Sequence, residues 1–129
     1  NMTQVVWNNK YLIGIEIIDT QHQQLFDIMN KLYIASEEDQ ELETIIGLFE
    51  ELKDYTKYHF TEEEIYFSKH PQDEIKRHKE LHQFFIKKLD ESIQQCIRIG
   101  ALSLELLFFL NDWLVEHIQV EDQKYVKYH

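Results

Sequence analysis

Five of the seven histidines in this chain form a spaced set with carboxylate residues, a combination that suits iron and other transition metals. Two of the spacings are four residues, about one helical turn, so both side chains of such a pair would point the same way. The set is spread over four segments, and only a folded chain could bring it together. Its members are His22, the pair His59 and Glu63, the pair His78 and His82, and the pair His117 and Asp122.

Four amphipathic segments would position these residues, because apolar side chains recur in each of them at every third or fourth residue. Only three glycines and one proline interrupt the chain, and no stretch alternates as a β-strand does. The apolar residues ahead of the first segment predict an N-terminal arm that packs on the domain. The predicted elements are the arm over residues 1–18 and helices over about 20–36, 41–68, 72–98 and 103–126.

The predicted helix ends rest on particular residues. Asp19 or Thr20 is expected to cap the first helix, and a hydrogen bond from Asp19 to His22 is the weaker alternative. Pro71 ends the second helix, since the residue before a proline avoids the helical region, and Gly100 ends the third. Short connections make successive helices antiparallel. The sequence therefore predicts an all-α fold, an up-down-up-down antiparallel four-helix bundle.

The candidate ligands all lie on the apolar stripes of their helices. Four helices would thus point polar groups at one interior, where an unpaired polar group costs free energy. A single histidine in such a place is most often a hydrogen-bonded core residue, but five on four stripes with matched carboxylates favour a metal site. If both carboxylates and a solvent oxygen bridge two metals, the five imidazoles divide as three and two. The second metal then keeps an open position for a ligand.

The composition of the chain indicates its cellular compartment and argues against some classes of binding partner. A net charge of −11 argues against nucleic acid and anionic membranes. No stretch of about 18 apolar residues is present, and residues 1–10 lack the pattern of a signal peptide. The single cysteine, Cys96, allows no internal disulfide, fits a reducing cytoplasm and is expected to be a small buried residue. The length fits one domain over residues 1–129.

With its ligands in this order, the chain resembles the hemerythrin family, and in length its single-domain bacterial members, the bacteriohemerythrins. The resemblance covers nearly the whole chain, from Trp7 through the segment that contains Asp19, Gln21 and His22 to Asp122. It implies a non-haem di-iron centre, two iron ions joined by an oxo or hydroxo bridge, that binds O2 reversibly. It also implies a role for each ligand candidate: His78, His82 and His117 on a six-coordinate iron, His22 and His59 on the iron with the open position, and Glu63 and Asp122 as bridges.

Reversible O2 binding requires a dry pocket without acidic groups, because a proton donor would expel reduced oxygen. Apolar side chains next to the ligands are the candidates for this pocket, and ordinary core packing is the alternative for each of them. The predicted O2 pocket comprises Leu25, Phe60, Trp113, Leu114 and Ile118.

The identity of the seventh ligand is open on spacing alone. His117 and Asp122 are five residues apart, about 140° on an ideal helix, so periodicity favours Glu121. The family pattern uses the five-residue spacing, which predicts a π-type turn, a feature common at functional sites. Tyr125 is expected either near the metals or in the core.

Other polar residues are expected to be bystanders. Glu62 and Glu64 flank Glu63 and are predicted to be solvated. His70, before the proline, and His129, at the end of the chain, are predicted to be exposed.

The expected function is O2 binding for carriage, storage or delivery, with an oxygen-consuming enzyme as a partner. Alternatives are an O2- or redox-sensing module of a larger signalling protein, a di-iron oxidase, peroxidase or nitric-oxide reductase, and a purely structural metal site. Ferritin-like oxidases use Glu-x-x-His pairs on two helices, and this chain has none, so we expect a binding protein and not an enzyme. The uneven division of ligands argues against a structural site. The residues alone do not distinguish iron from manganese or zinc.

Overall fold

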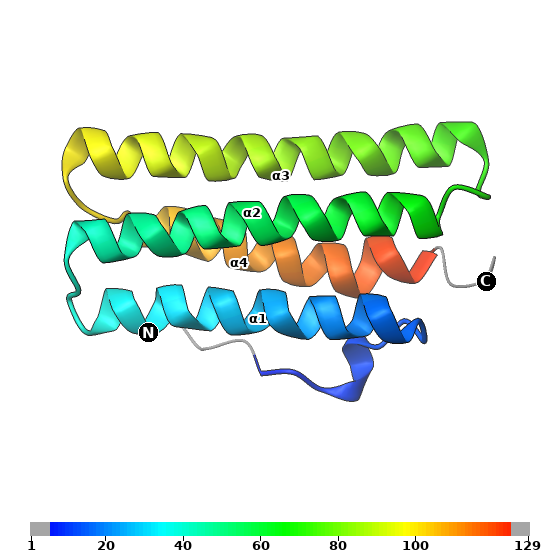
Figure 1. The fold of residues 1–129 in the computed structure, drawn as a ribbon, viewed down its shortest axis with the longest axis horizontal. Coiled ribbons are helices and arrows are strands. Elements are labelled where there is room, and N and C mark those ends of the chain that lie inside the picture. Colours follow the sequence, from blue (N-terminus) through cyan, green and yellow to red (C-terminus); the bar gives the residue numbers. More distant parts are fainter. Residues whose placement is uncertain (1–5, 125–129) are drawn as a thin grey trace.

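Four long helices lie side by side and alternate in direction along the chain (Figure 1). The computed structural model describes residues 6–124. A short 3-10 helix precedes the bundle, and a π-helical turn follows its last helix. The elements are η1 Asn9–Tyr11, α1 Glu16–Glu37, α2 Leu42–Tyr66, α3 Gln72–Ile99, α4 Leu104–Glu116 and η2 His117–Glu121. The predicted all-α, four-helix bundle is confirmed.

The core is built from the apolar stripes that the sequence predicted, with some additions. On α1 the buried face includes Leu25, Phe26 and Leu32. On α2 and α4, Phe49 and Leu107 are also fully buried. One continuous apolar cluster therefore runs through all four helices. Its members Leu25, Phe60 and Ile118 lie within three residues of a candidate ligand in the chain.

The start of α1 differs from the prediction. The helix begins at Glu16, a turn earlier than expected, and Ile15 precedes it without a side-chain cap. Asp19 is neither a cap nor a partner of His22. Its carboxylate instead accepts hydrogen bonds from the backbone N–H groups of Ile13 at 2.8 Å and Gly14 at 3.1 Å. The cap prediction was wrong because the arm, and not the first turn of the helix, supplies the donors that Asp19 binds.

The other helix ends follow local sequence rules. α3 ends at Gly100, whose φ of 72° lies in the left-handed region that glycine adopts at low cost. Ser103 caps α4, with its hydroxyl oxygen 3.4 Å from the backbone nitrogen of Leu106. α2 ends at Tyr66, two residues before the predicted boundary.

The loop between α2 and α3 corrects a further prediction. His70 was expected to be exposed, but only 3% of its surface is accessible. Its backbone N–H donates to the carbonyl of Phe67, and the two rings meet edge to face at 5.5 Å. Phe67 packs in turn against Ile13 and Ile18, so the loop closes the end of the bundle.

Cys96 is buried in the main apolar cluster, as predicted. Within residues 6–124, no helix combines the length and the apolar character needed to cross a membrane. The predictions for Tyr125 and His129 concern residues outside the described range.

Candidate metal centre

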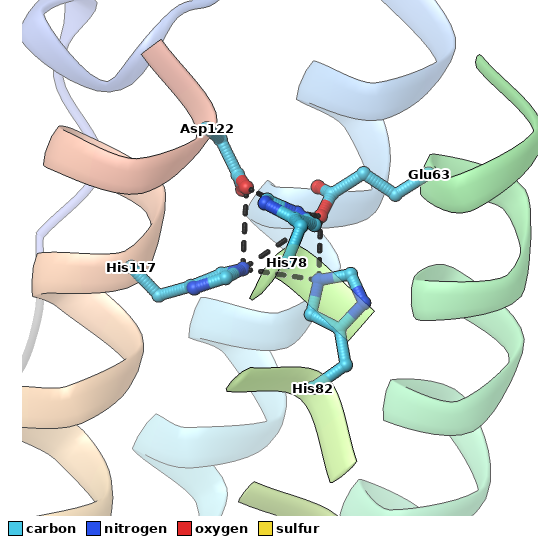
Figure 2. A group of neighbouring side chains, drawn as sticks. All are labelled: Glu63, His78, His82, His117 and Asp122. Carbon is cyan, nitrogen blue, oxygen red and sulfur yellow. Dashed lines mark hydrogen bonds and ion pairs between the residues drawn. The ribbon is translucent and has the colours of Figure 1, made fainter. Parts of the chain in front are cut away.

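The seven candidate ligands converge in the interior of the bundle, and each is at most 2% exposed. They form two overlapping groups, and within each group the potential donor atoms lie within 4.8 Å of one another. Figure 2 shows the side chains of the larger group pointing at a common centre from α2, α3, η2 and the residue that follows η2. The larger group is Glu63, His78, His82, His117 and Asp122, and the smaller is His22, His59, Glu63 and Asp122.

Glu63 belongs to both groups because its two oxygens point to different sets of histidines. Oε1 lies 2.9 Å from Nε2 of His78 and 2.9 Å from Nε2 of His82. Oε2 lies 3.2 Å from Nε2 of His22 and 3.0 Å from Nε2 of His59. The carboxylate of Glu63 thus spans the space between a three-histidine group and a two-histidine group.

Asp122 repeats this division. Its Oδ1 lies 3.2 Å from Nε2 of His117 and 3.3 Å from Nε2 of His78, whereas its Oδ2 lies 3.1 Å from Nε2 of His22. Among residues 6–124, neither oxygen has a well-aligned hydrogen-bond partner, although both are buried. Atoms that are close together but not aimed at each other converge on a third point, as the ligands of a metal ion do.

The separations of these atoms fit that explanation. Neighbouring ligands at about 2.1 Å from a metal ion, at a right angle, lie about 3.0 Å apart. Seven of the eight contacts between the imidazole Nε2 atoms and the oxygens of Glu63 and Asp122 run from 2.9 to 3.3 Å. The eighth, from Nε2 of His117 to Oε1 of Glu63, is longer at 3.7 Å. The residues present therefore fit a pair of metal ions bound side by side.

The ring of His82 gives a second, chemical test of the fit. Its Nδ1 lies 2.8 Å from Oε2 of Glu64, and a carboxylate can only accept, so Nδ1 carries the proton. In a neutral ring, Nε2 then presents a lone pair. That lone pair faces the Oε1 of Glu63 at 2.9 Å and the Nε2 of His117 at 3.1 Å. Lone pairs so close repel one another unless a proton or a metal cation lies between them.

Without a metal, the site balances its charges by holding protons. Burial by itself would lower the pKa of His22 and His117, but the carboxylates of Asp122 and Glu63 raise it to about 9 and about 10, respectively. Burial outweighs the carboxylates at His59 and lowers its pKa. Burial would raise the pKa of Glu63 and Asp122, yet the surrounding imidazoles keep both below their usual values. A cation would replace these protons directly.

The π-helical turn η2 explains the five-residue spacing from His117 to Asp122. A π-helix has more residues in each turn than an α-helix, so residues five apart return to the same side. Asp122 is fully buried at the site, whereas Glu121 turns outward, where Arg77 donates to both of its carboxylate oxygens. Arg77 thereby lowers the pKa of Glu121. The predicted π-type turn is confirmed, and periodicity alone would have selected Glu121, which belongs to neither donor group.

Two of the predicted pocket residues stack on histidine rings, and the other three are buried in the core. Phe60 stacks on the ring of His82 with centroids 3.7 Å apart, and Trp113 stacks on that of His117 at 4.7 Å. Trp113 is partly buried. The other three predicted pocket residues are at most 1% exposed and belong to the main core cluster: Leu25, Leu114 and Ile118. The histidine rings thus lie in a largely dry environment.

Two polar residues around the site escaped prediction. The side-chain carbonyl of Gln21 accepts a hydrogen bond from Nδ1 of the His59 ring at 2.7 Å, and both residues are buried. Glu64 was expected to be solvated, but its carboxylate binds His82 and only 28% of its side chain is exposed. Each lies next in the chain to a candidate ligand, and that adjacency is the only trace of the role in the sequence.

Comparison with known proteins identifies the family. The family model described as the hemerythrin HHE cation binding domain matches residues 13–128. A bacteriohemerythrin of Clostridium acetobutylicum is 32% identical over 126 residues, which cover 94% of this chain and 98% of the relative. A bacteriohemerythrin of Stenotrophomonas maltophilia is 33% identical and covers 96% and 80%, respectively. A hemerythrin-like protein of Naegleria gruberi is 29% identical over 92% of this chain and 88% of the relative. This chain therefore belongs to the hemerythrin family.

Proposed function

We propose that this protein binds O2 reversibly at a non-haem di-iron centre, for carriage, storage or delivery of oxygen. In this proposal three histidines hold one iron, two histidines hold the other, and two carboxylates and an oxo or hydroxo group bridge them. Together the irons would supply an open coordination position and two electrons for the bound gas. The proposed assignment is His78, His82 and His117 on the first iron, His22 and His59 on the second, and Glu63 and Asp122 as bridges.

The observation that carries this proposal is the division of the carboxylate oxygens. In both Glu63 and Asp122, one oxygen faces the three-histidine group and the other faces the two-histidine group. A mononuclear site needs no such arrangement. With both bridges shared, the two-histidine iron has one protein ligand fewer, which leaves the position that a diatomic gas would take.

The surroundings of the site favour binding over turnover. Oxygen that has accepted electrons is expelled when a nearby acid protonates it, and apolar side chains keep water and acids away. We infer that Leu25, Phe60, Trp113, Leu114 and Ile118 perform this task. Their apolar character and burial support the inference.

The single cysteine fits a reducing compartment, and we place the protein in the cytoplasm.

The test is a reversible spectrum. The protein is loaded with Fe(II) without air, its iron content is measured, O2 is added, and the gas is then removed under argon. We expect two irons per chain and an absorption band that appears with O2 and fades when it is removed. One iron per chain would overturn the proposal, and so would a band that bleaches irreversibly while an added reductant is consumed, which indicates an oxidase or peroxidase.

A sensory role is the second candidate, and the contacts of the arm favour it. Gln123, next to Asp122, donates from its amide to the carbonyl of Leu12 at 2.9 Å, and Asp19 holds Ile13 and Gly14. A shift of the metal bridge could therefore reach the arm. Limited proteolysis of the arm in the Fe(II) and Fe(III) forms tests this role, and equal cleavage rates would exclude it.

A further inference from the structure

One contact of the site reaches from a candidate ligand to the surface. Oε2 of Glu64 accepts a hydrogen bond from Nδ1 of His82 at 2.8 Å, and 28% of the Glu64 side chain is exposed. Glu64 lies on α2 and His82 on α3, so the contact links two helices. It also joins a side chain in the interior to one that water can reach.

The histidines of the site differ in the hydrogen-bond partner of Nδ1, the ring nitrogen that does not face the two candidate bridging carboxylates. His59 meets the neutral amide of Gln21 at 2.7 Å. The Nδ1 atoms of His22 and His117 are buried and make no hydrogen bond within the described residues 6–124. His82 is bound by a carboxylate that belongs to neither donor group. The two iron positions are therefore unequal in the charge around their histidines as well as in the number of histidines.

A surface groove of about 450 Å³ runs along α2 and α3 at this point. Phe60, Glu64 and His82 contribute to its lining, and the ring of Phe60 stacks on that of His82. The carboxylate of Glu64 thus borders solvent on one side and the imidazole on the other. From this position the carboxylate can influence His82 through its Nδ1 atom without itself contacting a metal ion bound at Nε2.

We propose that Glu64 is a positioning residue that sets the redox balance of the three-histidine iron through His82. Its carboxylate keeps the proton on Nδ1, which leaves Nε2 as a lone-pair donor to the metal, and its negative charge makes that donor stronger. A stronger donor favours Fe(III) over Fe(II). Removing the charge therefore shifts the centre toward Fe(II). The inference rests on the di-iron site proposed above.

The experiment compares two substitutions at Glu64 with a matched control. Glu64→Gln keeps an acceptor for Nδ1 but removes the charge, and Glu64→Ala removes both. Glu62→Gln removes the same charge two residues away on the same helix. For each protein we would measure the iron content, iron retention against a chelator, the midpoint potential, and the exchangeable Nδ1–H proton resonance of His82 in the Fe(II) form.

We expect Glu64→Gln to raise the midpoint potential by about 59 mV, which is a tenfold shift in the Fe(III)/Fe(II) ratio of a one-electron couple. Glu64→Ala should also release iron to the chelator about 10- to 100-fold more readily, and the Nδ1–H resonance should move or exchange faster. Glu62→Gln should match the parent protein in every measurement. The thermal stability of the metal-free proteins separates these effects from loss of a contact between helices.

Two results would overturn the inference. One is a midpoint potential that is the same in the parent protein, Glu64→Gln and Glu64→Ala. The other is an equal shift in Glu62→Gln, which would assign the effect to general surface charge. Failure of the proposed function looks different, since the parent protein itself would then not hold two irons. The inference about Glu64 is judged on a parent protein that does hold them.

Discussion

A carboxylate that bridges two cations with one oxygen on each must point its two oxygens at different places, and this residue-scale detail separates the possible sites. Glu63 and Asp122 meet the requirement, with Oε1 and Oδ1 toward one group of histidines and Oε2 and Oδ2 toward the other. Glu121, only one residue from Asp122, is bound by Arg77 at the surface. One step along the chain thus separates a residue of the buried donor cluster from a surface ion pair.

Removing Asp122 should abolish the paired site. We expect Asp122→Ala to lower the iron content from two per chain to one or less, because both iron positions lose an oxygen ligand. Glu121→Ala is the control, and it should keep two irons and change stability by less than about 1 kcal/mol, as partly exposed ion pairs do. Iron analysis after gel filtration measures both. Equal iron contents in the two variants would contradict the assignment of Asp122.

Leu114→Asn should speed oxidation of the O2-loaded protein severalfold. Leu114 is 1% exposed in the core near His117, and a polar amide there would bring water and proton donors to the site. Decay of the O2-dependent absorption band measures the rate. Leu104→Asn, at an exposed position at the start of the same helix, should leave the rate unchanged. If both variants decay like the parent protein, Leu114 does not line the pocket.

At the scale of the elements, local sequence sets some of the helix ends and tertiary contacts set the others. Gly100 and Ser103 end α3 and begin α4 through rules that operate within a few residues. The start of α1 and the loop at His70 depend instead on contacts with the arm. η2 lies between these cases. Its π-helical winding is a local feature of the backbone, but its consequence, which is that Asp122 reaches the site, depends on contacts with other helices.

The two glycines on α2 and after α3 should respond oppositely to alanine. Gly100 has a φ of 72°, so Gly100→Ala should destabilise the protein by about 1 kcal/mol. Gly47 lies within α2, and the space that a methyl group would occupy there is open, so Gly47→Ala should stabilise the protein by about 0.5 to 1 kcal/mol. Urea unfolding of the metal-free proteins measures both changes. Effects of the same sign would contradict this description of the α3 end.

At the scale of the whole molecule, the buried polar cluster makes stability depend on metal and pH together. Seven ionisable side chains meet at one site in the interior of a small bundle. Without a metal they remain there by sharing protons, and the imidazoles with raised pKa values carry positive charge. Bound iron would displace those protons, so the metal-free and the iron-loaded protein should respond differently to pH.

The metal-free protein should lose stability as the pH rises from about 6.5 to 10. The pKa of His22 is raised from 6.5 to about 9 and that of His117 to about 10, so their contribution is complete below pH 6.5 and is lost above it. A shift of this size corresponds to on the order of 3 kcal/mol for His22 alone. Thermal unfolding at a series of pH values measures the loss. The iron-loaded protein is the control, and an equal loss in it would contradict the assignment.

The family resemblance, and not residue spacing, indicated Asp122. The sequence by itself determined the helices, their order and the other six residues that meet at the site. This was possible because apolar periodicity and the histidine spacing are repeated, local patterns that need no knowledge of neighbours. Only the tertiary structure decided which oxygen of Glu63 faces which histidines, and that Glu64 and Gln21 form hydrogen bonds with the rings of two candidate ligands. It also decided that Asp19 binds the arm and that His70 is buried. The physical reason is the same in each case: a hydrogen bond or a buried surface depends on a partner from another segment, and the sequence around one residue does not specify that partner.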